Sequence, residues 1–192
     1  MPEDEMSEMP EPQIVQKNLW LSLFALAALF PAILLLMVSA RWAESASLYL
    51  ILWVLAVSDW HTYRLPNVWN AILVISGLIL HYLSDPASFS YYYIGAIAGF
   101  GSLALLSIAY YYVRGRHGLG MGDAKFMAGS GAWVGWPVLP QVFLLASCAA
   151  LIFAMIQKLR GQSVTMQSRL PFGPFLCLST WLVWVFMHQN LF

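Results

Sequence analysis

The chain has 192 residues, of which 60% are hydrophobic and only 9% are charged, and its mean hydropathy is +0.70. This composition excludes an ordinary soluble globular domain and is typical of a polytopic membrane protein. The formal net charge is +0 and the sequence has no basic patch, so we expect no nucleic-acid partner.

The N-terminal segment, residues 1–17, contains five of the nine acidic residues and three prolines. It has too little apolar surface to order itself, so we predict a disordered acidic tail. Residues 18–192 are expected to form one membrane domain surrounded by the lipid bilayer. Its first helix is predicted over residues 19–40, a nearly continuous apolar run that is long enough to cross about 30 Å of hydrocarbon.

The rest of the domain divides into further apolar segments separated by short polar loops. A polar turn at 41–45 precedes a helix that is either short, ending directly on Asp59, or carries Asp59 slightly into the membrane. Residues 128–132, AGSGA, are all small and permit close helix contact, so the helix that contains them is expected in the interior. These further helices are predicted at residues 46–58, 67–83, 91–113, 123–136, 137–157 and 171–188. The sequence therefore predicts an all-α bundle of about seven transmembrane helices.

Basic residues indicate how this bundle is oriented, because cytosolic loops of membrane proteins collect Lys and Arg. With the N-terminus in the cytosol, eight of the nine basic residues fall on the cytosolic side and only Arg41 on the outer side. On the same map, the helical part of the chain has two acids on its cytosolic side, Asp59 and Asp123. An acid at a membrane edge is costly, so this pair requires an explanation.

Asp59 and Asp123 are candidates for a catalytic pair. Two carboxylates brought close together do not both ionise easily, so one keeps a proton near neutral pH. The ionised group can take a proton from water while the protonated group polarises an amide carbonyl, which would hydrolyse a peptide bond. We assign the resting proton to Asp59 at a helix C-terminus, because Asp123 lies at a helix N-terminus, where the dipole favours negative charge.

Other interpretations of these residues remain open. Alone, Asp123 could be a helix N-cap and Asp59 a solvated loop residue, while Lys125 could extend toward lipid headgroups. The two acids could also bind protons or a partner without hydrolysis, in a small proton-coupled carrier or a pilus or secretion assembly scaffold. The sequence contains neither an HExxH nor a GxSxG motif, and His81 and His188 fall at outer helix ends.

Three motifs resemble those of the type IV prepilin peptidases, the GxGD class of membrane aspartyl proteases. Asp59 lies seven residues before Pro66 and Asn67, which is similar to the family's Asp-x6-Pro-Asn/Asp frame. Residues 120–125, GMGDAK, match GxGDxK, and residues 171–174 match the family's PFGP segment. The three motifs occur in the family's order.

The resemblance implies an activity, a substrate and a location. Asp59 and Asp123 would be the catalytic aspartates, and the substrate would be a prepilin or pseudopilin. Such enzymes cut a short basic leader after a glycine, at the cytosolic face of the bacterial inner membrane. Residues of the motifs would support catalysis or contact the substrate: Gly118, Gly120, Gly122, Lys125, Pro66, Asn67, Pro171, Phe172, Gly173 and Pro174.

Longer members of the family carry an N-terminal region that binds zinc through CxxC pairs, and many also methylate the new N-terminus with S-adenosylmethionine. Here 58 residues precede Asp59 and the sequence has no CxxC motif. The resemblance is therefore to the shorter, peptidase-only members associated with tight-adherence or bundle-type pili. We expect no metal and no cofactor, and the sequence leaves the oligomeric state open.

Overall fold

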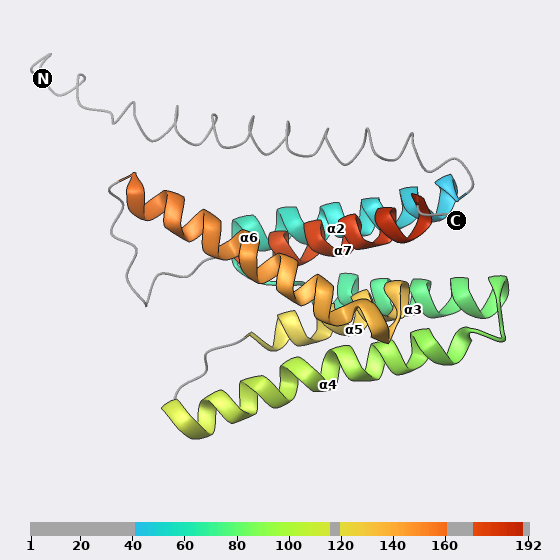
Figure 1. The fold of residues 1–192 in the computed structure, drawn as a ribbon, viewed down its shortest axis with the longest axis horizontal. Helices are drawn as coiled ribbons and strands as arrows, with labels where there is room; N and C mark the ends of the chain where they lie inside the picture. Colours follow the sequence, from blue (N-terminus) through green and yellow to red (C-terminus); the bar gives the residue numbers. More distant parts are fainter. Residues whose placement is uncertain (1–40, 116–119, 161–170, 190–192) are drawn as a thin grey trace, which may run out of the picture.

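The computed structural model describes residues 41–115, 120–160 and 171–189, and these residues form helices joined by short loops. Figure 1 shows α2 and α7 side by side, with α3, α4 and α5 in the other half of the bundle and α6 crossing obliquely. The elements are α2 (Trp42–Thr62), α3 (Asn67–Ser84), α4 (Phe89–Arg114), α5 (Met121–Val134), the 3₁₀ helix η2 (Trp136–Val138), α6 (Leu139–Leu159) and α7 (Gly173–Gln189). The predicted all-α architecture is confirmed.

The predicted boundaries of α3 to α7 agree with the structure to within two residues at each end. These helices are bounded by proline, glycine or polar residues, which are strong local signals for helix ends. The predicted acidic tail, 1–17, and the predicted first helix, 19–40, lie outside the described residues.

The helix predicted before Asp59 is present, but its predicted bounds, 46–58, are wrong. α2 has 21 residues, begins inside the predicted polar turn, and continues past Asp59 to Thr62. Hydropathy misplaced both ends because polar side chains in a terminal turn can bond locally without stopping the helix: the Thr62 hydroxyl donates to the Ser58 carbonyl at 2.7 Å. The helix stops at Tyr63, whose φ of 52° is a left-handed C-cap. Asp59 therefore lies within the last turn of α2.

α5 is an interior helix, as its small residues predicted. Nine of its 14 residues are buried, and it packs against α3, α4 and α7. The helices α4 and α5 approach each other closely because glycines of α4 lie directly against the backbone of α5. A Cβ on Gly95 would collide with the Gly131 carbonyl, and one on Gly99 with the Met127 carbonyl. Backbone therefore packs directly on backbone, as small residues allow in membrane helix pairs.

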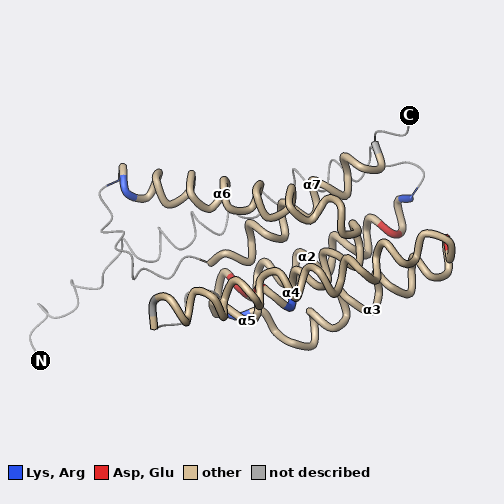
Figure 2. Tube along the Cα trace, turned by 60° about the horizontal axis from the view of Figure 1, so that its bottom comes forward, with Lys and Arg blue, Asp and Glu red and all other residues tan. Residues whose placement is uncertain are grey.

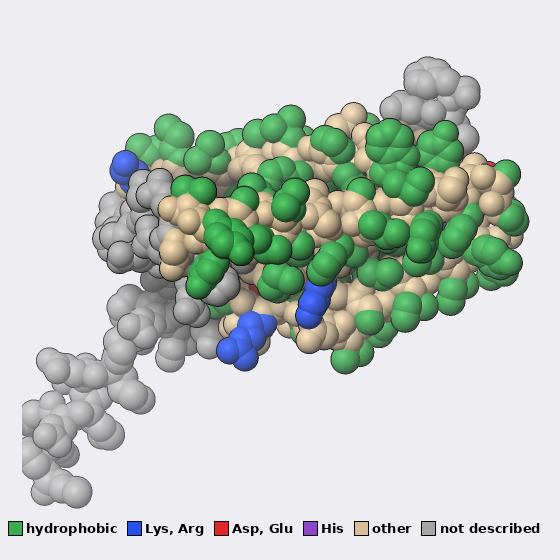
Figure 3. Space-filling view, turned by 90° about the horizontal axis from the view of Figure 1, so that it is seen from below, with side chains coloured by type: hydrophobic (Ala, Val, Ile, Leu, Met, Phe, Trp, Pro, Cys, Tyr) green, Lys and Arg blue, Asp and Glu red, His purple; other side chains and the backbone are tan. Residues whose placement is uncertain are grey.

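The outer surface of the bundle suits a lipid environment. Among the described residues, three helical segments are long and apolar enough to cross a membrane, Asn67–Ser84, Phe89–Val113 and Trp136–Leu159, and Gly173–His188 is a shorter apolar helix. Hydrophobic side chains cover most of the face in Figure 3. In Figure 2 the few charged residues lie near helix ends. The described helices therefore form an all-α membrane protein.

Candidate active site

The carboxylate of Asp59 is held by a residue 114 positions later in the chain. The N–H of Gly173, the first residue of α7, donates a hydrogen bond to Asp59 Oδ2 at 2.9 Å. Only 6% of Asp59 is exposed. A carboxylate that meets a backbone N–H at a helix N-terminus is stabilised by both the hydrogen bond and the helix dipole. The end of α2 and the start of α7 are therefore joined at this acid.

Gly173 leaves no room for a side chain at this contact. An added Cβ would lie 2.7 Å from Asp59 Oδ2 and 2.8 Å from Asp59 Cγ, closer than real Cβ atoms approach other atoms. The preceding residues fix the backbone, because Pro171 is buried and Phe172 packs edge-on against Phe143 of α6 with ring centroids 6.4 Å apart. Pro174 follows in the first turn of α7. The PFGP segment thus presents a backbone N–H to Asp59.

Asp123 is the third residue of α5, near the helix start that the sequence predicted. Its carboxylate lies over Gly120, where an added Cβ would be 3.3 Å from Asp123 Oδ2. Gly122 faces Leu65 in the loop between α2 and α3, at an ordinary contact distance of 3.4 Å from an added Cβ to Leu65 Cβ. Gly120 therefore makes room for the carboxylate, while Gly122 lets α5 begin against the neighbouring loop. Gly118 lies outside the described residues.

The two predicted acids lie within electrostatic range of each other, although 64 positions separate them in the chain. The charge of Asp59 acts on the carboxyl group of Asp123. The buried thiol of Cys177, one turn after Gly173 on α7, interacts electrostatically with both aspartates. Two carboxyl groups that interact in a largely buried site do not both ionise easily. The ends of α2, α5 and α7 therefore enclose a pair of coupled carboxyl groups.

Lys125 connects the second motif to the first. Its Nζ donates a hydrogen bond to Asn67 Oδ1 at 2.8 Å. Pro66 is the N-cap of α3 and Asn67 is its first residue, so the bond joins the starts of α3 and α5. Lys125 and Asp123 point to different faces of α5, as their spacing of two residues predicted. The pairing of Lys125 with Asn67 was not predicted, because the two residues are 58 positions apart in the chain.

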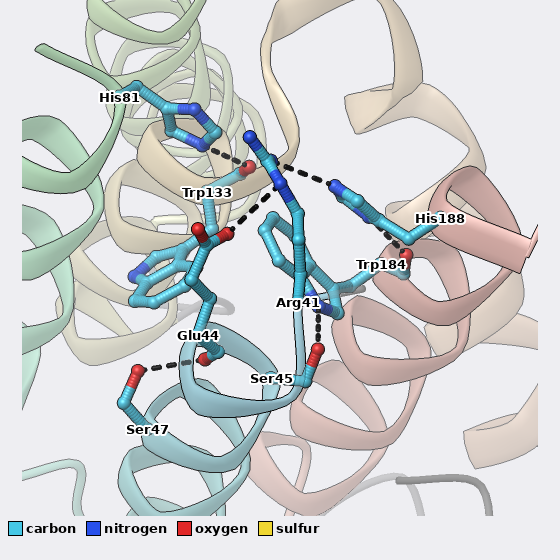
Figure 4. Close-up of polar contacts among 8 residues, drawn as sticks. All are labelled: Arg41, Glu44, Ser45, Ser47, His81, Trp133, Trp184 and His188. Carbon is cyan, nitrogen blue, oxygen red and sulfur yellow. Dashed lines mark hydrogen bonds and ion pairs between the residues drawn. The ribbon is translucent and has the colours of Figure 1, made fainter. Parts of the chain in front are cut away.

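A second polar group, which we call the outer cluster, lies at the ends of α2, α5 and α7 opposite the aspartates. Figure 4 shows its contacts. The cluster consists of Arg41, Glu44, Ser45, His81, Trp133, Trp184 and His188. Its two histidines, His81 and His188, lie at the outer helix ends where they were predicted, but the cluster itself was not predicted. The signal was weak because the residues come from four separate segments of the chain.

Hydrogen bonds and ring contacts tie the outer cluster together. His81 is 2% exposed, its Nε2 bonds to the Trp133 carbonyl at 3.0 Å, and its ring stacks on Tyr92 with centroids 3.3 Å apart. The Trp184 indole N–H donates to Ser45 Oγ at 3.0 Å. Among the described residues, no group of three or more His, Cys, Asp or Glu side chains is arranged to hold a metal ion. The cluster is therefore a structural connection between α2, α3, α5 and α7.

Comparison with known proteins places this chain in a family. A sequence profile described as the type IV leader peptidase family matches residues 46–155, more than half of the chain. The chain belongs to the type IV leader peptidase family. The range matched by the leader peptidase profile contains Asp59 and Asp123 and ends before Gly173.

The chain is also similar in sequence to individual members of the leader peptidase family. Leader peptidase HopD of Escherichia coli is 38% identical over 122 residues, which is 62% of this chain and 77% of HopD. A prepilin leader peptidase/N-methyltransferase of Dickeya chrysanthemi is 37% identical over 125 residues, 65% of this chain and 44% of the relative. One of Aeromonas salmonicida is 34% identical over 162 residues, 82% of this chain and 54% of the relative. The chain thus spans about half the length of the last two relatives. No solved structure matches the chain.

Proposed function

We propose that this protein is a membrane aspartyl endopeptidase that removes the basic leader of a prepilin or pseudopilin after a glycine. The observation that carries the proposal is the electrostatic effect of Asp59, buried at the end of α2, on the half-buried carboxyl group of Asp123 at the start of α5. Membership of the type IV leader peptidase family supports it, as do relatives named prepilin leader peptidases. The excess of Lys and Arg on the same side of the bundle supports a site at the cytosolic face of the inner membrane.

Burial disfavours a charge on Asp59, but the hydrogen bond from Gly173 supports assigning the resting proton to Asp123 rather than to Asp59, the opposite of the sequence-based expectation. That expectation considered only the helix on which each acid lies, and Asp59 is at the C-terminal end of α2. In the folded chain Asp59 also lies at the N-terminus of α7 and accepts a backbone N–H there, which favours its ionised form. Asp59 is therefore the resting carboxylate, and Asp123 carries the shared proton.

With Asp59 as the base and Asp123 as the acid, the pair can hydrolyse a peptide bond. Asp59 takes a proton from water as the water oxygen bonds to the scissile carbonyl carbon, and Asp123 gives its proton to the carbonyl oxygen. The tetrahedral intermediate collapses with cleavage of the C–N bond. The leaving nitrogen takes the proton held by Asp59, and a hydroxyl proton of the intermediate returns to Asp123. One water is consumed, a carboxylic acid and an amine are formed, and the pair returns to its starting state.

Cleavage of a model prepilin with a basic leader that ends in glycine before an apolar segment tests the proposal. Asp59→Asn and Asp123→Asn should each abolish processing while the protein stays folded, because each removes one of the two proton-transfer groups. Asp85→Asn is the matched control, since Asp85 is an exposed acid in the turn between α3 and α4, and it should process normally. Full processing by either site variant would overturn the proposal and leave the proton-coupled carrier or the assembly scaffold as explanations.

A further inference from the structure

The two helices that carry the aspartates make little direct contact with each other. α2 packs on α3 and α7, whereas α5 packs on α3, α4 and α7, and Figure 1 shows α2 and α5 in different halves of the bundle. The distance between the acids is therefore set by structures that contact both helices. One of these is the start of α7, which holds the Asp59 carboxylate. Another is the loop between α2 and α3, residues 63–66.

The backbone of this loop is fixed against the last turn of α2. The N–H of Tyr63, in its left-handed conformation, donates to the Asp59 carbonyl at 2.8 Å. The Ser58 hydroxyl donates to the Arg64 carbonyl at 3.4 Å, and the Thr62 hydroxyl lies 3.3 Å from the same oxygen. These local bonds give the loop a defined position relative to Asp59.

Leu65 is the buried residue of this loop. Tyr63 and Arg64 before it are exposed, whereas Leu65 is 8% exposed and belongs to the hydrophobic core. It packs on Gly122, where an added Cβ would lie 3.4, 3.8 and 3.9 Å from Leu65 Cβ, Cδ1 and Cγ. Gly122 directly precedes Asp123 in the first turn of α5. The Leu65 side chain therefore occupies the space between the end of α2 and the start of α5.

A polar contact next to Leu65 holds the same part of α5. Asn67, two positions after Leu65, accepts the hydrogen bond from Lys125 at 2.8 Å. Gly122 and Lys125 lie on either side of Asp123 in the chain. One apolar and one polar contact from residues 65–67 thus locate the turn of α5 that carries the second acid.

We propose that Leu65 is a positioning residue that sets the distance between the carboxyl groups of Asp59 and Asp123. It acts through the backbone of α5, because its side chain is buried against Gly122. Removing this side chain would let the start of α5 shift and would admit water. Both changes would weaken the interaction between the two carboxyl groups. The proposal rests on the proposed peptidase function.

Single-turnover cleavage of a model prepilin by Leu65→Ala, measured against pH and substrate concentration, tests this role. We expect the maximal rate to fall about 10- to 100-fold, because small misplacements of catalytic groups are costly. The half-saturating substrate concentration should stay near the wild-type value, since Leu65 is buried. The descending limb of the pH–rate profile should move to lower pH, because a weaker interaction releases the shared proton more easily. Leu65→Met, with a similar volume, should recover most of the rate.

Leu73→Ala is the matched control. Leu73 of α3 is also buried and packs on a glycine of α5, since an added Cβ on Gly129 would lie 2.5 Å from Leu73 Cδ2. Gly129 is six positions after Asp123, so this contact supports α5 farther from the acid. Leu73→Ala should lower Tm but keep the rate per folded molecule and the pH–rate profile.

Infrared spectroscopy separates a failure of this proposal from a failure of the peptidase function, because it needs no substrate. The band of a protonated carboxyl group should be present in the wild type and absent in Asp123→Asn. In Leu65→Ala this band should disappear at a lower pH than in the wild type. No cleavage by the wild type would overturn the peptidase function itself.

Two results would overturn the role of Leu65 while the wild type cleaves prepilin. One is an unchanged pH–rate profile and an unchanged infrared titration in Leu65→Ala. The other is an equal shift of both in Leu73→Ala, which would indicate general loosening of α5. If Leu65→Ala fails to fold, Leu65→Val, which removes one methylene group, should shift both measurements in the same direction by a smaller amount, and no shift would count against the proposal.

Discussion

The two ends of the bundle contain polar side chains from the same helices, but these side chains are held differently. In the outer cluster, His81 of α3 bonds to the Trp133 carbonyl of α5, and the Trp184 indole N–H of α7 donates to Ser45 of α2. The His81 ring stacks on Tyr92, and the Trp184 ring packs edge-on against Trp133. At the other end, the described residues give the Asp59 carboxylate one backbone N–H, and Asp123 lies over glycine. A closed network fixes helices, whereas carboxylates with spare acceptor capacity can exchange partners with water and substrate. We therefore expect the outer cluster to control stability and the aspartate pair to control activity.

The largest expected contrast comes from neutralising one acid at each end. Asp123→Asn should lower the rate of prepilin cleavage about 10²- to 10⁴-fold, the usual effect of losing a general acid or base, with little change in Tm. Glu44→Gln in the outer cluster should retain the cleavage rate per folded molecule. Rates under single-turnover conditions and Tm in detergent measure both effects. A similar loss of rate in Glu44→Gln would remove the distinction between the two ends.

Gly173→Ala should give the next largest effect. The added methyl group would meet the Asp59 carboxylate at 2.7 Å and displace it from the backbone N–H, so we expect cleavage to fall about 10- to 100-fold. Gly101→Ala is the matched control, because a Cβ there meets nothing within 4 Å among the described residues. It should keep full activity and gain about 0.5–1 kcal/mol of stability from the helical alanine. Equal activity of the two variants would show that the contact between Gly173 and Asp59 has no role in catalysis.

At the outer cluster, His81→Ala should reduce stability rather than activity. The change removes a buried ring, its hydrogen bond to the Trp133 carbonyl and its stacking on Tyr92, so we expect a loss of about 2–4 kcal/mol. Denaturant unfolding in detergent would measure the loss, and cleavage per folded molecule should stay near the wild-type value. A selective loss of cleavage with unchanged stability would contradict the structural role of His81.

Ser45→Ala should have the smallest effect. It leaves the buried Trp184 indole N–H without its acceptor, which costs about 1–2 kcal/mol for an unpaired buried donor. Ser45→Thr keeps the hydroxyl and should be closer to the wild type in unfolding free energy. If Ser45→Ala were as stable as the wild type, the bond between α2 and α7 at this end would not contribute to stability.

The sequence predicted which residues belong to the candidate site more accurately than it predicted their contacts. Charge placement and motif spacing predicted that Asp59 and Asp123 form a pair, because local rules govern helix starts and membrane-facing charge, and the two acids do lie within electrostatic range of each other. The ends of α2 were misplaced because hydropathy does not report local hydrogen bonds. The N–H that bonds to Asp59 could not be foreseen, because it comes from α7, which begins 114 residues later in the chain.

If Asp59 and Asp123 act as one catalytic unit, a double-mutant comparison will show it. Single-turnover cleavage of a model prepilin would be measured for Asp59→Asn, Asp123→Asn and the double variant, with folding checked by Tm. Substitutions of residues that act together have strongly non-additive effects on the rate. We therefore expect the double variant to cleave no more slowly than the slower single variant. Losses that multiply in the double variant would contradict this expectation and show that the two aspartates act independently.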